Sequence, residues 1–557
     1  MRKPSVSKYK FSAALVLLVS VIFSGCASSE NAIQNSANRS VSQTELAKNE
    51  TYSTSPKMSS NNSMATNTTT KNMPLGIAED EAADRKSDGE KYAEINENPF
   101  LEVVRAPLST FSIDVDTAAY SNIRRYLNDG QLPPKDAVRI EEMINYFEYD
   151  YPQPVGDVPF AVYPEVASCA WNPKHKIVHI GLQGKKVSLD NVPASNLVFL
   201  LDVSGSMNEP RKLPLLQDAL KILVNQLTAK DRVSIVTYAG NSGLVLPSTS
   251  AANKGEILNA INNLQSGGST NGGAGIQLAY KVAQENFIRD GNNRVILATD
   301  GDFNVGLSSD SELVSLIENK RQSGVFLSVL GFGSGNTNDS MMEKLANKGN
   351  GNYAYIDSNE EARKALGSQV AGTLYTIAKD VKIQVEFNPA KVSGYRLIGY
   401  ENRLLADRDF NDDTKDAGEI GAGHTVTAIY EIIPAGQKVE NPGVDELKYS
   451  RVEKSETNFS SELMTIKLRY KEPQDDQSKL MSIGVLDRNY SIENASENVR
   501  FASAVAQFGL LLRDSRYKGN ASFSSVKNLA SDALGGDLRN YRNEFLGLVN
   551  KAKNLKN

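Results

Sequence analysis

Two apolar runs that each end in an aspartate mark the centre of this chain. Residues 196–207 read NLVFLLDVSGSM, so five apolar residues are followed directly by Asp202. A second run, 294–300, reads RVILATD. A continuous apolar run bounded by turn residues is typical of a strand buried on both faces, as in a parallel sheet. Both aspartates are therefore predicted at the carboxyl ends of strands, the edge at which open α/β sheets place their ligand sites.

Apolar runs alternate with helical patterns over residues 191–374, which predicts a doubly wound, mostly parallel α/β sheet. The expected strands are 197–202, 232–238, 244–247, 294–300, 325–332 and 352–356, and the expected helices begin near Leu213 and cover 281–288, 313–320 and 340–348. Gly331, Gly333 and Gly335 follow a strand. The last glycine comes too early for a dinucleotide-binding loop and no phosphate-loop lysine follows, so no nucleotide site is predicted.

Oxygen donors gather around these strand ends. Ser204 and Ser206 follow Asp202 at alternate positions, and the glycine-rich loop 267–275, GGSTNGGAG, carries Thr270. If both strands lie in one parallel sheet, Asp202 and Asp300 emerge at the same edge, where the loop can bring Thr270 to them. Such hard oxygen donors suit a small divalent cation such as Mg²⁺.

The motifs DVSGS, GGST and TDG, in this order, resemble the von Willebrand factor type A (VWA) domain. In that family the constellation is the metal-ion-dependent adhesion site. The resemblance implies that Asp202, Ser204, Ser206, Thr270 and Asp300 hold Mg²⁺ or Mn²⁺. It also implies that an acidic side chain of a partner protein completes the coordination of the metal, and hence that the protein binds rather than catalyses.

Two other functions remain open at this point. In an envelope scaffold the metal would be structural or regulatory, and partner binding would need neither the metal nor a free carboxylate. In a metal-dependent phosphoryl-transfer enzyme Asp202 would be the nucleophile. Residues 202–208 contain neither a second acid nor a lysine, which argues against the enzyme.

The first residues look like a targeting segment. Basic residues precede an apolar stretch, 11–23, that is too short to span a membrane comfortably. Ser24, Gly25 and Cys26 resemble a bacterial lipobox, with Cys26 as the lipidated residue, although Phe23 stands where an aliphatic residue is usual. Residues 1–26 are therefore predicted to be a lipoprotein signal peptide, and an ordinary signal peptide or an uncleaved anchor are the alternatives. The expected location is the bacterial cell envelope, lipid-anchored on the periplasmic or surface face, with residues 27–92 as a polar, disordered tether.

The flanks of the VWA region carry alternating strand patterns at 160–188 and at 379–470. We expect these strands, which lie in the N-terminal segment 93–190 and in the β-rich and then helical C-terminal domain 375–557, to join into one β-sandwich with the VWA domain inserted between them. Helices are expected at 120–127 and 135–147, and again at 499–512, 522–534 and 540–552. These flanks resemble the N-terminal segment and the C-terminal domain of unknown function that accompany the VWA domain in a family of bacterial lipoproteins.

Two acidic stretches are further candidates for binding a cation. Asp407, Asp409 and Asn411 fit the first, third and fifth places of a calcium loop, but the sixth place is Asp412 instead of glycine and the acidic twelfth ligand is missing. Solvated turns of this kind are common. Asp114 and Asp116 could bind a metal or cap the helix that follows them.

Composition removes several classes of function. A net charge of −5 gives no reason to expect nucleic-acid binding. Three histidines and two cysteines in 557 residues argue against a zinc site or a Cys–His enzyme.

Overall fold

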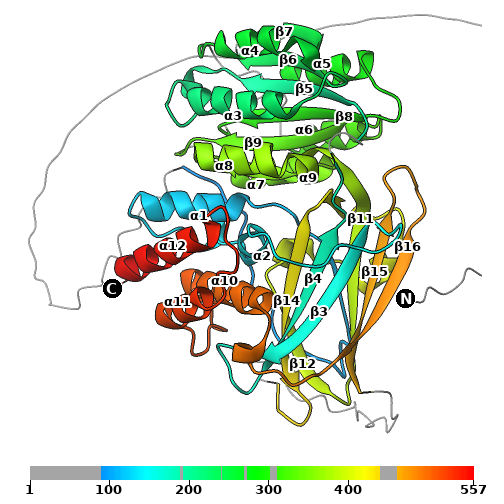
Figure 1. The fold of residues 1–557 in the computed structure, drawn as a ribbon, viewed down its shortest axis with the longest axis vertical. Helices are drawn as coiled ribbons and strands as arrows, with labels where there is room; N and C mark the ends of the chain where they lie inside the picture. The colour runs from blue at the N-terminus through cyan, green and yellow to red at the C-terminus, as the bar shows by residue number, and fades with distance from the viewer. Residues whose placement is uncertain are drawn as a thin grey trace, which may run out of the picture. The chain divides into compact units, whose positions relative to one another are not determined.

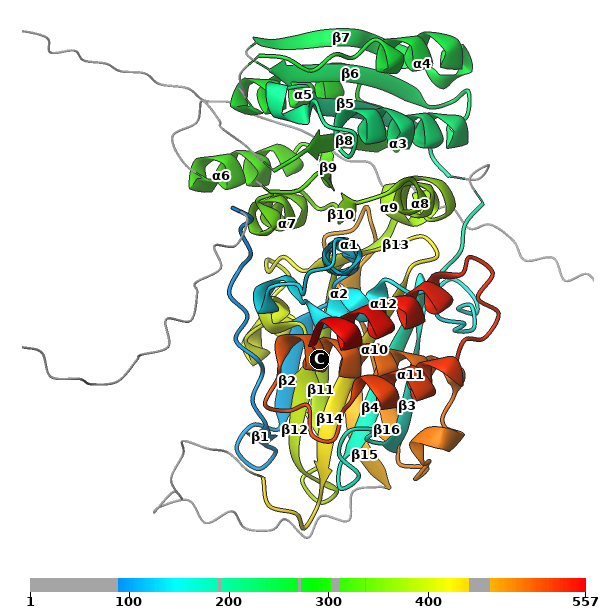
Figure 2. The same ribbon diagram turned by 90° about the vertical axis from the view of Figure 1, so that its left-hand side faces the viewer.

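The centre of the chain forms a six-stranded, mostly parallel sheet in the order β10-β9-β8-β5-β6-β7 (Figure 1; β10 is labelled in Figure 2). The computed structural model describes residues 89–188, 192–239, 241–268, 272–301, 310–335, 337–439 and 461–556. The strands of this sheet are β5 (Ser195–Asp202), β6 (Arg232–Ala239), β7 (Asn241–Ser250), β8 (Asn292–Thr299), β9 (Phe326–Phe332) and β10 (Tyr353–Ile356). Strand β7 is antiparallel at one edge, and the others are parallel. The predicted doubly wound sheet is confirmed.

Strand β5 is buried on both faces, as its unbroken apolar run predicted. Leu197, Phe199 and Leu201 share a core with α3, α4, α8 and α9, whereas Val198 and Leu200 share one with α5, α6 and α7. These helices are α3 (Leu213–Gln226), α4 (Lys254–Asn262), α5 (Gly272–Glu285), α6 (Asp310–Arg321), α7 (Asp339–Lys348), α8 (Asn359–Arg363) and α9 (Val370–Leu374). Helices on both faces leave the carboxyl-terminal edge of the sheet as the place for a site.

The two flanks together build a pair of further sheets. One has the order β1-β12-β14-β4-β3, and the other β13-β11-β15-β16 with β2 also paired to β11. The strands are β1 (Leu101–Glu102), β2 (Leu108–Ser112), β3 (Phe160–Ser168), β4 (Lys176–Gly184), β11 (Thr376–Phe387), β12 (Val392–Ile398), β13 (Gly418–Gly421), β14 (Thr425–Pro434), β15 (Glu462–Lys471) and β16 (Lys479–Leu486).

Strands from before and after the α/β domain pair directly with one another. Strand β4 pairs antiparallel with β14, and β2 pairs antiparallel with β11. Side chains of both sheets, such as Ile180 and Ile466, meet in one buried core. The prediction that the flanks join into a β-sandwich with the α/β domain inserted between them is therefore confirmed.

A layer of helices covers one sheet of the sandwich (Figure 2). Its members are α1 (Ala118–Asn128), α2 (Ile140–Asn145), α10 (Glu497–Arg513), α11 (Phe523–Ser531) and α12 (Tyr541–Lys556). Phe501 and Phe508 of α10 lie in the same core cluster as Ile177 of β4 and Ile429 of β14. The helix predicted at 135–147 is confirmed in part: a 3₁₀ turn, Lys135–Ala137, is separated from the short α2 by Val138 and Arg139. The backbone of Arg139 is extended there, because its side chain forms buried ion pairs with Glu142 and Asp339 that override the helical pattern.

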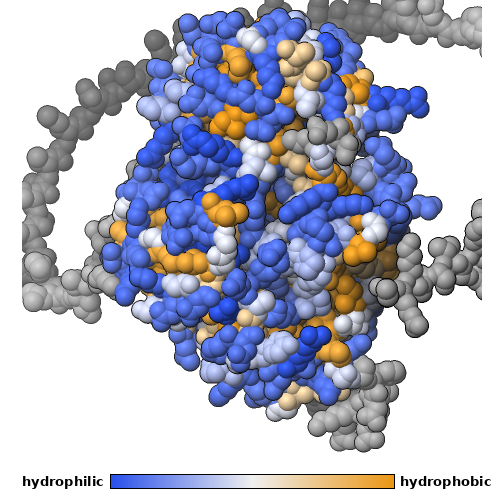
Figure 3. All heavy atoms as spheres, in the orientation of Figure 1, coloured by the Kyte–Doolittle hydropathy of each residue, from blue (hydrophilic) through white to orange (hydrophobic). Residues whose placement is uncertain are grey.

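Side chains on the face drawn in Figure 3 are mostly hydrophilic, with hydrophobic residues in small separate groups. Scattered apolar side chains of this kind are normal for a protein surface. None of the helices in the described ranges combines the length and the apolar character that crossing a membrane requires.

Candidate metal centre

Three of the predicted cation ligands lie together at the end of β5. Asp202 is the last residue of β5, and Ser204 and Ser206 follow in a 3₁₀ turn. The Ser204 backbone N–H donates to Asp202 Oδ1 at 2.9 Å, and the two serine Oγ atoms lie 3.0 Å apart. Asp300 directly follows β8, which pairs with β5 in parallel, so the two aspartates share one sheet edge as predicted.

The glycine-rich loop begins against this turn. Gly205 N–H donates to Gly268 O at 3.1 Å, and Gly267 N–H donates to Val203 O at 2.8 Å. Thr270 itself lies outside the described residues, as does Cys26, so its part in the site stays a prediction. The two backbone bonds nevertheless bring the start of the loop to the serine turn.

Asp202 is a buried carboxylate surrounded by neutral donors. Besides Ser204, the Tyr238 hydroxyl and Thr299 Oγ1 each donate to Asp202 Oδ2 at 3.3 Å. No ion pair reaches Asp202 from the part of the chain that the structure describes. Burial raises the pKa of Asp202 to about 6, and the charge of Asp300 acts in the same direction. Burying an ionised carboxylate without a cation is unfavourable, so this environment favours a bound positive charge.

A lysine that the sequence interpretation missed reaches the other aspartate. Lys212 Nζ lies 3.1 Å from Asp300 Oδ2, and their side chains are 3% and 0% exposed. Residues 202–208 lack a lysine, as noted above, but Lys212 is placed four residues farther on, immediately before α3. A helix start favours Ser, Thr or Asp and disfavours cations. The lysine at this unfavourable position was therefore the sequence signal that could have pointed to a role of Lys212 at the site.

The donor set fits a small, hard divalent ion. Asp202 and Asp300 supply carboxylate oxygens, and Ser204 and Ser206 supply neutral hydroxyls. Mg²⁺ and Mn²⁺ prefer oxygen donors of this kind. Over the described ranges no group of three or more His, Cys, Asp or Glu side chains is arranged to hold a metal.

The second predicted cation site has a different local structure. Asp407, Asp409 and Asn411 lie on a 3₁₀ helix, Asp407–Asn411. Asp407 Oδ1 accepts a hydrogen bond from Thr110 Oγ1 at 2.8 Å, and Asn411 Oδ1 accepts one from Arg469 Nε at 3.1 Å. These contacts give no support for a calcium ion, and this site stays a prediction.

Asp114 and Asp116 belong to a buried cluster of charged residues. The N-cap position of α1 is held by Thr117 and by neither aspartate, and the side chain of Thr117 makes no capping hydrogen bond. Both carboxylates lie 3.1 Å from Arg403 Nη2. We call this group the acid–arginine cluster, and its members are Asp114, Asp116, Arg139, Glu142, Asp339, Glu343 and Arg403.

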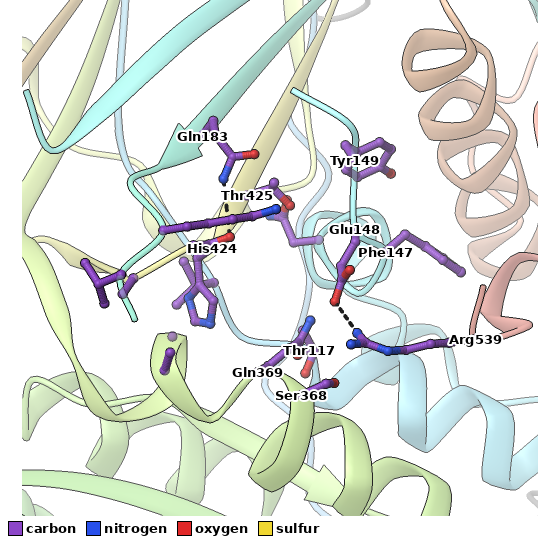
Figure 4. Close-up of a pocket in the computed structure, with 18 residues that line it drawn as sticks. Thr117, Phe147, Glu148, Tyr149, Gln183, Ser368, Gln369, His424, Thr425 and Arg539 are labelled. Carbon is purple, nitrogen blue, oxygen red and sulfur yellow. Dashed lines mark hydrogen bonds and ion pairs between the residues drawn. The ribbon is translucent and has the colours of Figure 1, made fainter. Parts of the chain in front are cut away.

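A separate pocket of about 320 Å³ lies among α9, the start of β14 and the segment after α2 (Figure 4). His424 lines it, and burial together with the charge of Lys364 lowers the pKa of this histidine to about 4, so its imidazole is neutral at pH 7. On the opposite side, Arg539 Nη1 donates to Glu148 Oε1 at 2.8 Å. Asp202, Ser204, Ser206 and Asp300 do not line this pocket.

Comparison with known proteins gives matches along most of the chain. The model of the von Willebrand factor type A domain matches residues 196–369, a von Willebrand factor model matches 86–179, and a model of the C-terminal region of uncharacterized protein YfbK matches 372–555. The chain is 45% identical over 472 residues to "Uncharacterized protein YfbK" of Escherichia coli (strain K12), covering 83% of this chain and 81% of that protein.

More distant similarity links the chain to further proteins with lower sequence identity. Inter-alpha-trypsin inhibitor heavy chain H3 of Homo sapiens is 28% identical over 262 residues, which is 43% of this chain and 29% of that protein. The solved structure of a von Willebrand factor type A protein from Catenulispora acidiphila is 16% identical, with a TM-score of 0.39, and the match covers 71% of this chain and 91% of that one.

Proposed function

The chain belongs to the YfbK family of proteins with a von Willebrand factor type A domain, and on this premise we propose that it binds a partner protein through a divalent cation. Asp202, Ser204, Ser206, Thr270 and Asp300 hold the ion, which is Mg²⁺ or Mn²⁺. The observation that carries the proposal is the carboxylate of Asp202, which is fully buried and, within the part of the chain that the structure describes, accepts hydrogen bonds from neutral donors alone. Because these donors carry no positive charge, a cation that binds beside the carboxylate balances its negative charge.

When bound, the metal supplies an open coordination place that an acidic side chain of the partner can fill. The chain's own residues prepare this place. The Ser204 N–H and the Tyr238 hydroxyl orient the carboxylate of Asp202. The backbone hydrogen bond between Gly205 and Gly268 connects the serine turn to the loop that carries Thr270. Ligand binding at the ion therefore affects both segments.

The alternative to metal-dependent partner binding is a scaffold in which the metal is structural or regulatory. Phosphoryl transfer at Asp202 is less favoured than either. Both oxygens of Asp202 already accept hydrogen bonds. Lys212 forms an ion pair with Asp300 and therefore does not point its ammonium at the place of a transferred phosphoryl group. These contacts favour binding over catalysis, since a phosphoryl-transfer site needs cations positioned on the transferred group.

The deciding experiment immobilises the full-length protein in mild detergent and passes an envelope extract over it. We expect a protein to be retained with Mg²⁺ and lost with EDTA or with Asp202→Ala. Asp218→Ala, which changes an exposed aspartate on α3, is the matched control and keeps the partner. Amidation of the partner's carboxyl groups with a carbodiimide should abolish rebinding. Equal retention in all samples would instead support the scaffold.

The proposal includes a lipid anchor at Cys26 that holds the protein at the bacterial envelope. It rests on the sequence around Cys26, because a basic segment and a short apolar stretch lead to it. An acyl chain would hold the protein at a membrane surface without spanning it. Labelling cells with an alkyne fatty acid should mark the wild-type protein and not Cys26→Ala. Labelling of both would contradict the anchor at this residue.

A further inference from the structure

We propose that Lys212 is an internal cation that competes with the divalent ion for Asp300 and so sets the metal concentration at which the site loads. This inference rests on the proposed function, because it assumes that the site holds a metal. It adds a residue outside the five expected ligands and gives that residue a measurable role.

The contact between Lys212 and Asp300 is a buried ion pair at the proposed metal site. Nζ lies 3.1 Å from Asp300 Oδ2, and the lysine side chain is only 3% exposed. This oxygen belongs to one of the two carboxylates that the proposal assigns to the metal, so Lys212 and the ion compete for the same group. An ammonium and a metal ion that share one carboxylate repel each other, and low solvent exposure strengthens that repulsion.

The stem of Lys212 is held in place by the connection between β9 and α7. A Cβ added to Gly333 would lie 2.4 Å from Lys212 Cε and 2.7 Å from Lys212 Cγ, so the lysine stem lies directly against this glycine. Gly333 has a φ of +78°, which glycine adopts without strain. The backbone therefore keeps the lysine stem beside the site, and only the ammonium end has freedom to change partner.

A second acceptor for the ammonium lies at the rim. Glu209 Oε1 is 3.6 Å from Lys212 Nζ, and the side chain of Glu209 is 60% exposed. When a metal takes Asp300, the ammonium moves from Asp300 toward Glu209 while the stem stays against Gly333. Loading with metal is thus coupled to a change of ion-pair partner at the start of α3.

The charge of Lys212 acts in opposite directions on the metal and on the partner. Asp202 and Asp300 carry two negative charges, so a divalent ion alone leaves the site neutral. With the lysine included, the ion and the groups around it carry one positive charge, and the exposed Glu209 at the rim becomes the partner of the ammonium. The lysine therefore weakens metal binding but strengthens the attraction of the loaded site for an acidic side chain.

The test measures Mg²⁺ binding to the full-length protein by isothermal titration calorimetry and by thermal unfolding. Lys212→Met keeps the length of the side chain and removes its charge. We expect Mg²⁺ to bind at least about ten-fold more tightly to this variant, because a like charge beside the ion has been removed. In EDTA the variant should melt earlier than wild type, and Mg²⁺ should restore its stability. Lys221→Met removes an exposed charge from the same helix and should change neither value.

The outcomes separate the two proposals. If wild type binds no Mg²⁺, or if Asp202→Ala binds it equally well, the proposed function fails together with this inference. If wild type binds Mg²⁺ through Asp202 but Lys212→Met leaves the affinity unchanged or weaker, only the role of Lys212 is overturned. A Lys212→Met protein that folds only with Mg²⁺ supports the competition, whereas one that stays unfolded with and without Mg²⁺ contradicts it.

Discussion

The metal centre and the acid–arginine cluster are both buried and acidic, but different groups neutralise their carboxylates. In the cluster, five carboxylates share the guanidinium groups of Arg139 and Arg403, and Arg403 alone contacts three of them within 3.3 Å. At the metal centre the ammonium of Lys212 pairs with Asp300, and among the described residues no cation contacts Asp202. The donors to Asp202 in those residues are a backbone N–H and two hydroxyls.

This difference separates a structural role from a binding role. Carboxylates bonded to arginine have their charge balanced within the folded chain. The cluster also links distant segments, since Asp116 Oδ1 accepts the backbone N–H of Tyr353 at 2.8 Å and Asp339 and Glu343 lie on α7. A carboxylate with only neutral donors leaves its charge for a cation from solution. Acidity alone therefore did not distinguish Asp114 and Asp116 from Asp202 in the sequence, whereas the partners in the structure do.

The largest effect is expected from Arg403→Met, which leaves Asp114, Asp116 and Glu343 without this guanidinium. Removing one partner from a buried ion pair destabilises by roughly 3–5 kcal/mol. Urea unfolding measures the change. Arg408→Met is the control, because the side chain of Arg408 is 91% exposed and lies on the next 3₁₀ helix along the chain. Equal stability of the two variants would show that the cluster does not stabilise the fold.

A pH effect is expected from Glu141, which lies beside the cluster. Burial, with the charge of Glu401, raises the pKa of Glu141 from 4.5 to about 7. The folded chain keeps this proton at pH values where the unfolded chain releases it, so the free energy of unfolding falls as the pH rises from 4.5 to 7.

Glu141→Gln removes this loss because the amide does not ionise. Relative to wild type, the variant should gain about 3 kcal/mol in free energy of unfolding between pH 4.5 and pH 8. Denaturant unfolding at several pH values measures it. For Glu360→Gln, at a side chain that is 73% exposed, the difference from wild type in free energy of unfolding should not change with pH, which we call a flat difference. A flat difference for Glu141→Gln as well would contradict a buried, protonated Glu141.

Adding metal should act on one region and not on the other. At 100 times its Kd, Mg²⁺ should stabilise the protein by about 2.7 kcal/mol, because it binds the folded state alone. Asp202→Asn should remove this gain, whereas Arg403→Met should keep it. The measurement is the melting temperature of each protein with Mg²⁺ and with EDTA. Loss of the gain in a folded Arg403→Met protein would show that the two regions are not independent.

The sequence predicted the parts of the site that depend on local pattern. The apolar run before Asp202 predicted a buried strand, and the parallel arrangement placed Asp300 at the same edge. Lys212 was missed because its contact with Asp300 spans 88 residues and depends on how α3 meets β8. In the same way, nothing in the local pattern of 135–147 showed that Arg139 would reach Asp339 and shorten the helix. Long-range ion pairs of this kind appear only once the chain has folded.

The smallest predicted effect concerns a neutral donor at the metal centre. Thr299 Oγ1 donates to Asp202 Oδ2 at 3.3 Å and accepts the Gly301 N–H at 3.0 Å. Thr299→Val keeps the shape and loses both bonds, which should lower the free energy of unfolding by about 1–2 kcal/mol.

Thr299→Ser retains the hydroxyl and is the matched control, and calorimetry compares the Mg²⁺ affinity of both variants with wild type. Because the donors to Asp202 are neutral, losing one changes orientation but no charge. The affinity should therefore change by less than about ten-fold, which corresponds to 1.4 kcal/mol. A larger loss for Thr299→Val than for Asp202→Asn would mean that the hydroxyls, and not the buried carboxylate, dominate the attraction for the metal.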